Sequence, residues 1–256
     1  MKKVLLTTLL IFLANFLFAQ TATRVIVRAK AKDAKFIGSS IGGAQIIVRD
    51  KATGEILAKG VTEGSTGNTK LIMNTPKARD LQIAEKSTAK FEAALALTEP
   101  TFITIEATAP MNQKQAAVTA TTELWVIPGK DILGDGIVIE IPGFVVNVLA
   151  PRTHQSISLA SLENSELSIQ ANIVMMCGCP ITSGGMWDAN QMEVRGILKK
   201  EGKLVKEVEM SVGNEANLFS AKTTLAETGY YELVIFAYNA TTGNTGVDKV
   251  NFSLGK

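Results

Sequence analysis

The sequence predicts an all-β protein, built as two consecutive β-sandwiches that follow an N-terminal signal peptide. Three observations lead to this prediction. Short runs rich in β-branched residues recur along the chain and are separated by glycine, proline and asparagine turns. An apolar run directly follows two lysines at the N-terminus. Several proline and glycine residues between positions 128 and 153 divide the rest into two halves.

Residues 1–19 have the three-part order of a secretory signal peptide. Lys2 and Lys3 precede an apolar run that ends in the small residue Ala19 and the polar Gln20. The run is shorter than the roughly 20 residues that span a bilayer, so cleavage is favoured over a retained anchor. We expect cleavage near Ala19–Gln20, with Ala22 as the alternative, and export to the periplasm or out of the cell.

The mature chain is expected to be electrically neutral. Cleavage removes two of the 26 basic residues and leaves 24, which equals the number of acidic residues. A neutral chain offers no electrostatic attraction to nucleic acid or to an anionic membrane surface. We therefore expect another envelope protein or a surface polymer as the partner, no nucleic acid, and no membrane span after cleavage.

The strands are predicted from alternating or β-branched runs. They cover residues 24–28, 44–49, 55–59, 69–73, 101–107, 123–127, 136–141, 144–149, 166–176, 191–198, 204–210, 218–224, 230–238 and 247–254. Residues 77–97 suit a helix, although the alternation after Lys90 suits a strand equally well. Glycine-containing turns at 50–54, 200–202 and 239–243 predict hairpins.

The boundary between the two sandwiches is placed near Pro142. This division gives an N-terminal domain of residues 20–141 and a C-terminal domain of residues 142–256. In a second interpretation, residues 136–149 form a hairpin that joins the two halves.

Residues 41–62 resemble the repeat of carboxypeptidase-regulatory-like and related prealbumin-like β-sandwiches. In those domains a strand of small and β-branched residues is followed by a Thr-Gly hairpin, matched by Thr53 and Gly54. A second strand then ends before an acidic, glycine-rich turn, matched by Glu63 and Gly64. The match covers about two strands and implies a sandwich fold for this half.

Residues 225–237 are similar to the tyrosine-corner strand of immunoglobulin-like and fibronectin-III-like domains. Tyr231, two residues after Gly229, matches the corner tyrosine, whose hydroxyl binds nearby backbone in those families. Leu233 stands where immunoglobulin domains have a cysteine, so their inter-sheet disulfide is absent. Such folds host adhesion, binding, accessory and structural roles, so the resemblance implies a fold and no particular function.

Residues 174–188 are chemically unlike the rest of the chain. They contain both cysteines, three of the eight methionines and one of the two tryptophans. The segment follows a strand and contains Pro180 and two adjacent glycines, so it is expected to form a loop at one end of the second sandwich. Trp187 and Asp188 are expected to cap that end, or else to contact a ligand or an interface.

Four interpretations of this loop remain open, and a local Cys177–Cys179 disulfide leads them because exported proteins meet oxidising conditions. A second is a Cu(I) site, since thiolates and thioethers are soft ligands. Its candidate ligands are Cys177, Cys179, Met175, Met186 and Met192. The third is a thiol–disulfide exchange site, and the fourth is a pair of buried thiols in the core.

The sequence offers no convincing catalytic constellation. His154 is the single histidine, and no serine has a nucleophile-elbow pattern around it. The glycine-rich stretches 38–43 and 60–67 lack the Gly-Lys-Ser/Thr of a phosphate loop. We therefore expect an exported, non-catalytic binding or structural protein of the cell envelope, with no cofactor. The alternative is a copper-binding or thiol-redox accessory protein that uses the cysteine loop.

Overall fold

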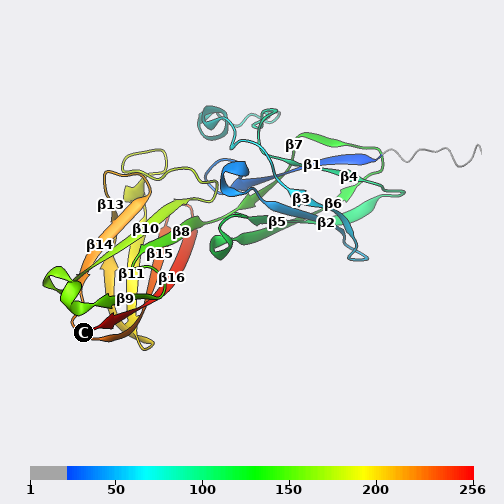
Figure 1. The fold of residues 1–256 in the computed structure, drawn as a ribbon. Helices are drawn as coiled ribbons and strands as arrows, with labels where there is room; N and C mark the ends of the chain where they lie inside the picture. Colours follow the sequence, from blue (N-terminus) through cyan, green and yellow to red (C-terminus); the bar gives the residue numbers. More distant parts are fainter. Residues whose placement is uncertain (1–21) are drawn as a thin grey trace, which may run out of the picture.

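The computed structural model describes residues 22–256, which form four sheets arranged as two sandwiches (Figure 1). The predicted signal peptide, residues 1–19, lies outside the described residues. Within the described part, no helix is long and apolar enough to cross a membrane. The sheets confirm the all-β fold class that the strand patterns predict.

The first sandwich contains seven strands and three short helical turns. The strands are β1 (Thr23–Ala31), β2 (Gln45–Asp50), β3 (Ile56–Val61), β4 (Phe91–Leu95), β5 (Thr101–Ala109), β6 (Val118–Val126) and β7 (Ile132–Ile141). The turns are η1 (Ser39–Ile41), η2 (Lys70–Asn74) and η3 (Lys114–Ala116). One sheet has the order β4-β1-β7 and the other the order β3-β2-β5-β6. Apolar side chains that alternate along β2 and β5, such as Ile46 and Ile103, are fully buried between them.

The second sandwich contains the remaining strands. They are β8 (Phe144–Ala150), β9 (Gln155–Ser158), β10 (Glu166–Met175), β11 (Glu193–Lys200), β12 (Lys203–Glu209), β13 (Ser211–Val212), β14 (Leu218–Thr224), β15 (Gly229–Asn239) and β16 (Asn244–Gly255). The helical turns are η4 (Leu159–Ser161), η5 (Glu163–Ser165) and η6 (Ala189–Gln191). One sheet has the order β13-β14-β10-β8 and the other the order β12-β11-β15-β16-β9.

The predicted hairpin turns are confirmed, and side-chain hydrogen bonds explain them. Asp50 Oδ1 accepts hydrogen bonds from the backbone N–H groups of Ala52 and Thr53, at 2.7 and 2.9 Å. Asn239 Oδ1 accepts in the same way from the residues two and three positions on, both at 3.0 Å. Gly54, with φ of 77°, then reverses the chain in a conformation that suits glycine.

Three local predictions are wrong. Residues 70–74 form η2, a π-helical turn, and not a strand, because Asn68 Oδ1 binds the backbone of Leu71 and Ile72 is buried without a pairing strand. Residues 77–89 form turns and bridges and no helix, while β4 pairs with β1. Residues 136–149 are not a hairpin, because β7 pairs with β1 whereas β8 pairs with β10.

A buried arginine on β1 holds the irregular segment before β4. The Arg28 side chain is 3% exposed and donates hydrogen bonds to the carbonyl oxygens of Thr88 and Ala89, at 2.5 and 2.9 Å. Burial lowers the pKa of Arg28, against the opposing field of the Asp135 carboxylate. Asp135 in turn accepts two backbone N–H groups of the same segment, both at 2.9 Å. The segment is irregular, yet its buried backbone groups have partners.

Pro142 and Gly143 connect the two sandwiches, which lie end to end (Figure 1). Gly143 has φ of 119°, and a Cβ atom there would lie 2.9 Å from the carbonyl oxygen of Thr245. Both facts require glycine at this position. That residues 20–141 and 142–256 behave as separate domains stays a prediction.

Candidate functional site at the junction of the sandwiches

The cysteine loop begins with a tight turn closed by a disulfide. β10 ends at Met175, and the Met175 N–H donates to the Cys179 carbonyl at 3.1 Å. Gly178, with φ of 78°, forms the tip of the turn between Cys177 and Cys179, whose Cα atoms lie 5.4 Å apart. The strand stops before the cysteines, so both cysteines belong to the turn.

The two cysteines of the loop are joined in a disulfide, which bears on each chemical interpretation of the loop. While the bond is intact, neither sulfur is a thiolate, so the cysteines are not soft-metal ligands. Cys177 and Cys179 are 1% and 4% exposed. Thiol–disulfide exchange requires a thiolate to approach a sulfur atom, and this burial obstructs such an approach. The structure therefore contains the local disulfide that leads the sequence-based interpretations.

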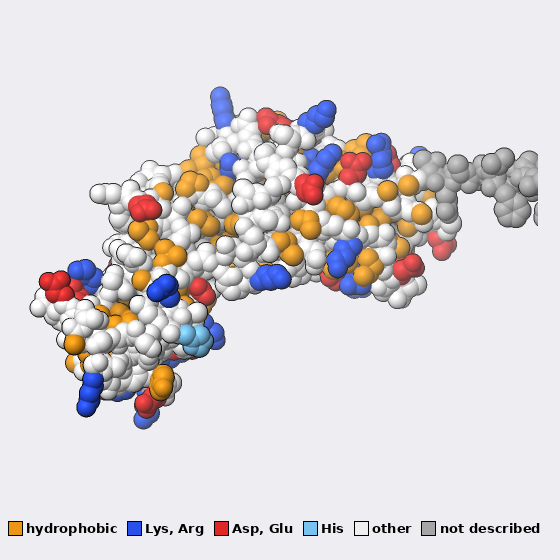
Figure 2. Space-filling view, in the orientation of Figure 1, with side chains coloured by type: hydrophobic (Ala, Val, Ile, Leu, Met, Phe, Trp, Pro, Cys, Tyr) orange, Lys and Arg blue, Asp and Glu red, His pale blue; other side chains and the backbone are white. Residues whose placement is uncertain are grey.

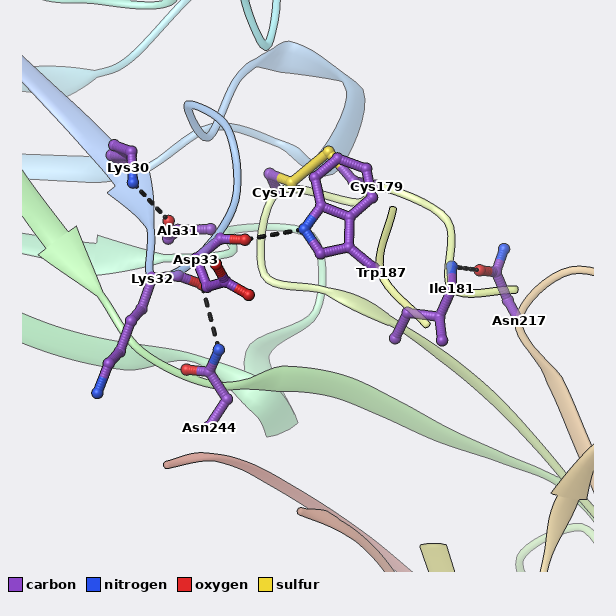
Figure 3. Close-up of a disulfide and its surroundings, with 10 residues drawn as sticks. All are labelled: Lys30, Ala31, Lys32, Asp33, Cys177, Cys179, Ile181, Trp187, Asn217 and Asn244. Carbon is purple, nitrogen blue, oxygen red and sulfur yellow. Dashed lines mark hydrogen bonds between the residues drawn. A yellow bond between two sulfur atoms is a disulfide. The ribbon is translucent and has the colours of Figure 1, made fainter. Parts of the chain in front are cut away.

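The loop packs against the first sandwich. A Cβ atom placed on Gly178 would lie 3.5 Å from Cδ1 of Ile41, so the tip of the turn faces that buried side chain. Trp187 Nε1–H donates a hydrogen bond of 2.8 Å to the carbonyl oxygen of Asp33 (Figure 3). The loop of the second sandwich thus contacts the turn that follows β1 of the first sandwich.

Asn244, at the start of β16, makes the most deeply buried polar connection between the sandwiches. The Asn244 residue is 0% exposed. Its Oδ1 accepts from the Gly143 N–H at 2.9 Å, and its Nδ2 donates to the Lys32 carbonyl at 3.2 Å (Figure 3). The side-chain amide of Asn244 therefore binds both the connector and the first sandwich. Its carbonyl oxygen and its NH2 group each have a hydrogen-bond partner.

Asp188 shapes the loop and does not cross the junction. Its Oδ1 accepts hydrogen bonds from the backbone N–H groups of Gly184 and Asn190, at 2.7 and 3.0 Å. These bonds, that from Asn190 first, hold the pKa of Asp188 below its ordinary value of 3.8. The carboxylate also caps the first turn of η6.

The candidate methionines line one small cavity of about 30 Å³ at the junction. Met175, Met186 and Met192 contribute to its walls, together with Trp187 and Asp188. Met175 is 3% exposed whereas Met186 is 49% exposed. Residues 22–256 contain no group of three or more His, Cys, Asp or Glu side chains arranged to hold a metal ion. The cavity is roughly the size of one water molecule. Because the cysteines form a disulfide, the methionine thioethers are the soft metal donors that line it.

Tyr231 and Gly229 lie at the opposite end of β15 from this junction. The Tyr231 hydroxyl donates to the Glu227 carbonyl at 2.9 Å, and its ring stacks on Phe252 at 5.4 Å between centroids. Burial raises the pKa of Tyr231. Gly229 has φ of 147°, and a Cβ atom there would lie 2.7 Å from Lys200 Cε. Both residues fix the fold of the sandwich.

Among solved structures the chain is similar to fibronectin-III-like and immunoglobulin domains, the families that its tyrosine-corner strand resembles. With the fibronectin(III)-like modules of Clostridium thermocellum CbhA it shares 11% identity at a TM-score of 0.28, over 91% of this chain and 94% of that one. With the titin domains Z1Z2 in complex with telethonin it shares 12% identity at a TM-score of 0.25, over the same shares.

An engineered protein is 11% identical over 51% of this chain, at a TM-score of 0.33, and the chain spans 24% of that protein's length. No protein-family model matches the chain, and a search of curated proteins finds no match either. The resemblance of residues 41–62 to carboxypeptidase-regulatory-like domains stays a prediction.

Reasoning from the sequence missed Asn244, Lys32 and Asp33 as junction residues. Asn244 follows a predicted hairpin turn and reads as part of that turn. Lys32 and Asp33 contribute backbone carbonyl oxygens, which any residue carries. The usable signal is Trp187, because its indole N–H is a hydrogen-bond donor in a segment that is otherwise mostly apolar or small.

Proposed function

We propose that this chain is an exported, non-catalytic protein of the cell envelope that binds another envelope protein or a surface polymer through two sandwiches docked as one unit. The observation that carries the proposal is that the cysteine loop serves as a structural contact between the two sandwiches. The chemically unusual segment of the chain closes on itself through a disulfide and packs on the first sandwich.

Contacts from three separate segments support docking of the two sandwiches. Trp187 and Asn244 reach the turn after β1, and Gln115 Nε2 donates to Asn147 Oδ1 at 2.6 Å from the other direction. A freely hinged pair would leave the amide of Asn244 in water, whereas this residue is 0% exposed. Fixed orientation suits a protein that presents a surface at a set distance, because less entropy is lost when a partner binds.

Export is supported by residues 1–19 and by the disulfide. Structural disulfides persist in oxidising compartments such as the periplasm and the cell exterior, and are rare in a reducing cytosol. The neutral balance of the mature chain agrees with a partner that is neither nucleic acid nor an anionic membrane.

The proposal is tested on the full-length chain, expressed with its own N-terminus and purified from the exported fraction without reductant. Intact mass should show a chain that begins at Gln20 and lacks the two thiol hydrogens of Cys177 and Cys179. The mature protein should also co-sediment with isolated cell envelopes, with heat-unfolded protein as the control. A chain that stays in the cytoplasm with residues 1–19 intact, or that turns over members of a hydrolase substrate panel, would overturn the proposal.

Metal analysis of the same sample decides the copper alternative. We expect no copper, because the cysteines are oxidised and the cavity beside the methionines is small. Copper bound one to one, and lost in a Cys177→Ser, Cys179→Ser double variant, would replace the binding role with metal handling.

A further inference from the structure

A polar groove crosses the outer face of the sheet β12-β11-β15-β16-β9, at the end away from the junction. Strand register assembles it from residues distant in sequence. Tyr230 on β15 lies opposite Ser253 on β16, and Ser253 lies opposite Ser156 on β9. One row further along, Glu232 lies opposite Asn251. Three strands therefore place hydroxyl, amide and aromatic groups side by side on one face.

Tyr230 stands out from this face. It is 77% exposed, the highest value among the large apolar and aromatic side chains that are exposed in residues 22–256. The structural role in this part of the strand belongs to its neighbour Tyr231, which is buried and donates a hydrogen bond to the Glu227 carbonyl. The ring of Tyr230 is therefore not required by the core and is accessible to a ligand, and tyrosine is a residue type enriched at binding interfaces.

Tyr230 lines two hollows. One, of about 410 Å³, is bounded by His154, Glu201, Asn251 and Ser253. The other, of about 560 Å³, runs along β9 from Ser156 to Ser158. Both lie in the range of roughly 300–1,000 Å³ typical of small-ligand pockets. Figure 2 shows a histidine side chain (pale blue) on the surface of the second sandwich, and His154 is one of the residues that line the first hollow.

The charges of the first hollow select against anions. Glu201 and Glu232 line it, and of the described residues that form its walls none is lysine or arginine. The nearby Lys199 is already paired with Glu232, at 3.2 Å, and Lys200 is paired with Glu227, at 2.6 Å. A phosphate or a carboxylate ligand in the first hollow would therefore lie beside the Glu201 carboxylate, whereas Lys256 borders only the second hollow.

The remaining groups suit a neutral, hydroxyl-rich ligand. Ser156 Oγ and Ser253 Oγ lie 3.2 Å apart, and hydroxyl groups both donate and accept. The Asn251 amide adds a donor and an acceptor, and the carboxylates accept hydrogen bonds from hydroxyl groups. The exposed ring of Tyr230 offers an apolar face to the C–H side of a sugar ring.

We propose that the groove around Tyr230 binds a neutral saccharide unit, with the sugar stacked on the Tyr230 ring and its hydroxyl groups bound by Ser156, Ser253 and Asn251. This inference rests on the proposed binding function and narrows the surface polymer to a neutral polysaccharide.

The test is electrophoresis of the mature protein in native gels that contain one soluble polysaccharide each. The neutral probes are hydroxyethyl cellulose, arabinoxylan, galactomannan and dextran, and alginate is the anionic probe. At least one neutral probe should retard the wild type, whereas alginate should not. Tyr230→Ala should weaken that retardation by about tenfold or more, and Tyr230→Phe should keep most of it, because the ring is retained.

Tyr238→Ala is the matched control. Tyr238 lies on the same strand, is 37% exposed, and is absent from both hollows. The control should bind as the wild type does, and all three variants should unfold at the wild-type temperature because both side chains are exposed. Absence of retardation by every neutral probe, retardation by alginate alone, or equal weakening in Tyr230→Ala and Tyr238→Ala would overturn the inference.

Sedimentation with cell envelopes separates this inference from the proposed function. If Tyr230→Ala co-sediments as well as the wild type and no neutral polysaccharide binds, the envelope role stands and the saccharide site fails. If the wild type itself does not co-sediment, the proposed function fails.

Discussion

Replacing Asn244 with alanine should loosen the docking of the two sandwiches more than it disturbs either one. The asparagine side chain satisfies the Gly143 N–H and the Lys32 carbonyl across the junction. Alanine removes both hydrogen bonds and, being smaller, introduces no steric conflict. The second sandwich then loses its most deeply buried polar contact with the connector and with the first sandwich.

The expected loss follows from the two groups left without a partner. A buried donor or acceptor that loses its hydrogen bond costs roughly 1–3 kcal/mol. The Gly143 N–H is buried, whereas the contact to Lys32 is partly buried and longer, at 3.2 Å. We therefore expect the free energy of unfolding to fall by about 2–4 kcal/mol.

The assay is urea unfolding followed by tryptophan fluorescence in a Trp125→Phe background, so that Trp187 at the junction is the reporter. Multidomain proteins often unfold in steps, so the first transition is the quantity to compare. Asn251→Ala, on the same strand but exposed, should change the free energy by no more than about 0.5 kcal/mol. An Asn244→Ala value within that same margin would refute the argument that this amide holds the sandwiches together.

Three further predictions address single contacts. Arg28→Met should lower the free energy of unfolding by about 2–4 kcal/mol in urea titrations, because the carbonyl groups of the segment before β4 lose their buried donor. Trp187→Phe should cost about 1 kcal/mol for the lost bond to Asp33, while Trp125→Phe, at 62% exposure, should cost less. The depressed pKa of Asp188 means that its carboxylate stabilises the fold at neutral pH and that this contribution disappears as the pH falls below 3.8. The difference in unfolding free energy between wild type and Asp188→Asn should therefore shrink in acid, and a difference that stays constant with pH would contradict this assignment.

Local physics made the strands and turns predictable. A strand with one buried face repeats every two residues, and the chemistry of its turns lies within five residues of sequence. Asp50 and Asn239 bind their own neighbouring backbone, so the hairpins that they start can be recognised without the rest of the chain. The tyrosine-corner strand is local in the same sense, since Tyr231 and its acceptor Glu227 are four residues apart.

The errors arose where tertiary contacts overruled the local pattern. Residues 69–73 are β-branched and apolar enough for a strand, yet Ile72 is buried as part of a π-helical turn. Residues 77–89 are rich in helix formers, yet the segment follows the hydrogen bonds offered by Arg28 and Asp135. Helix propensity contributes less free energy per residue than a buried hydrogen bond whose loss would leave a group unpaired.

The sequence by itself determined that this is an all-β chain, where its hairpins turn, and that residues 174–188 are chemically distinct. Only the tertiary structure decided what that distinct segment contacts. Trp187 and Asp33 are separated by 154 residues and Asn244 and Lys32 by 212, and both pairs meet through a backbone carbonyl oxygen. Register across β9, β15 and β16 likewise decided the groove around Tyr230. Periodicity and turn chemistry act between neighbours in sequence and can be read from it, whereas these contacts depend on which surfaces the folded sheets bring together.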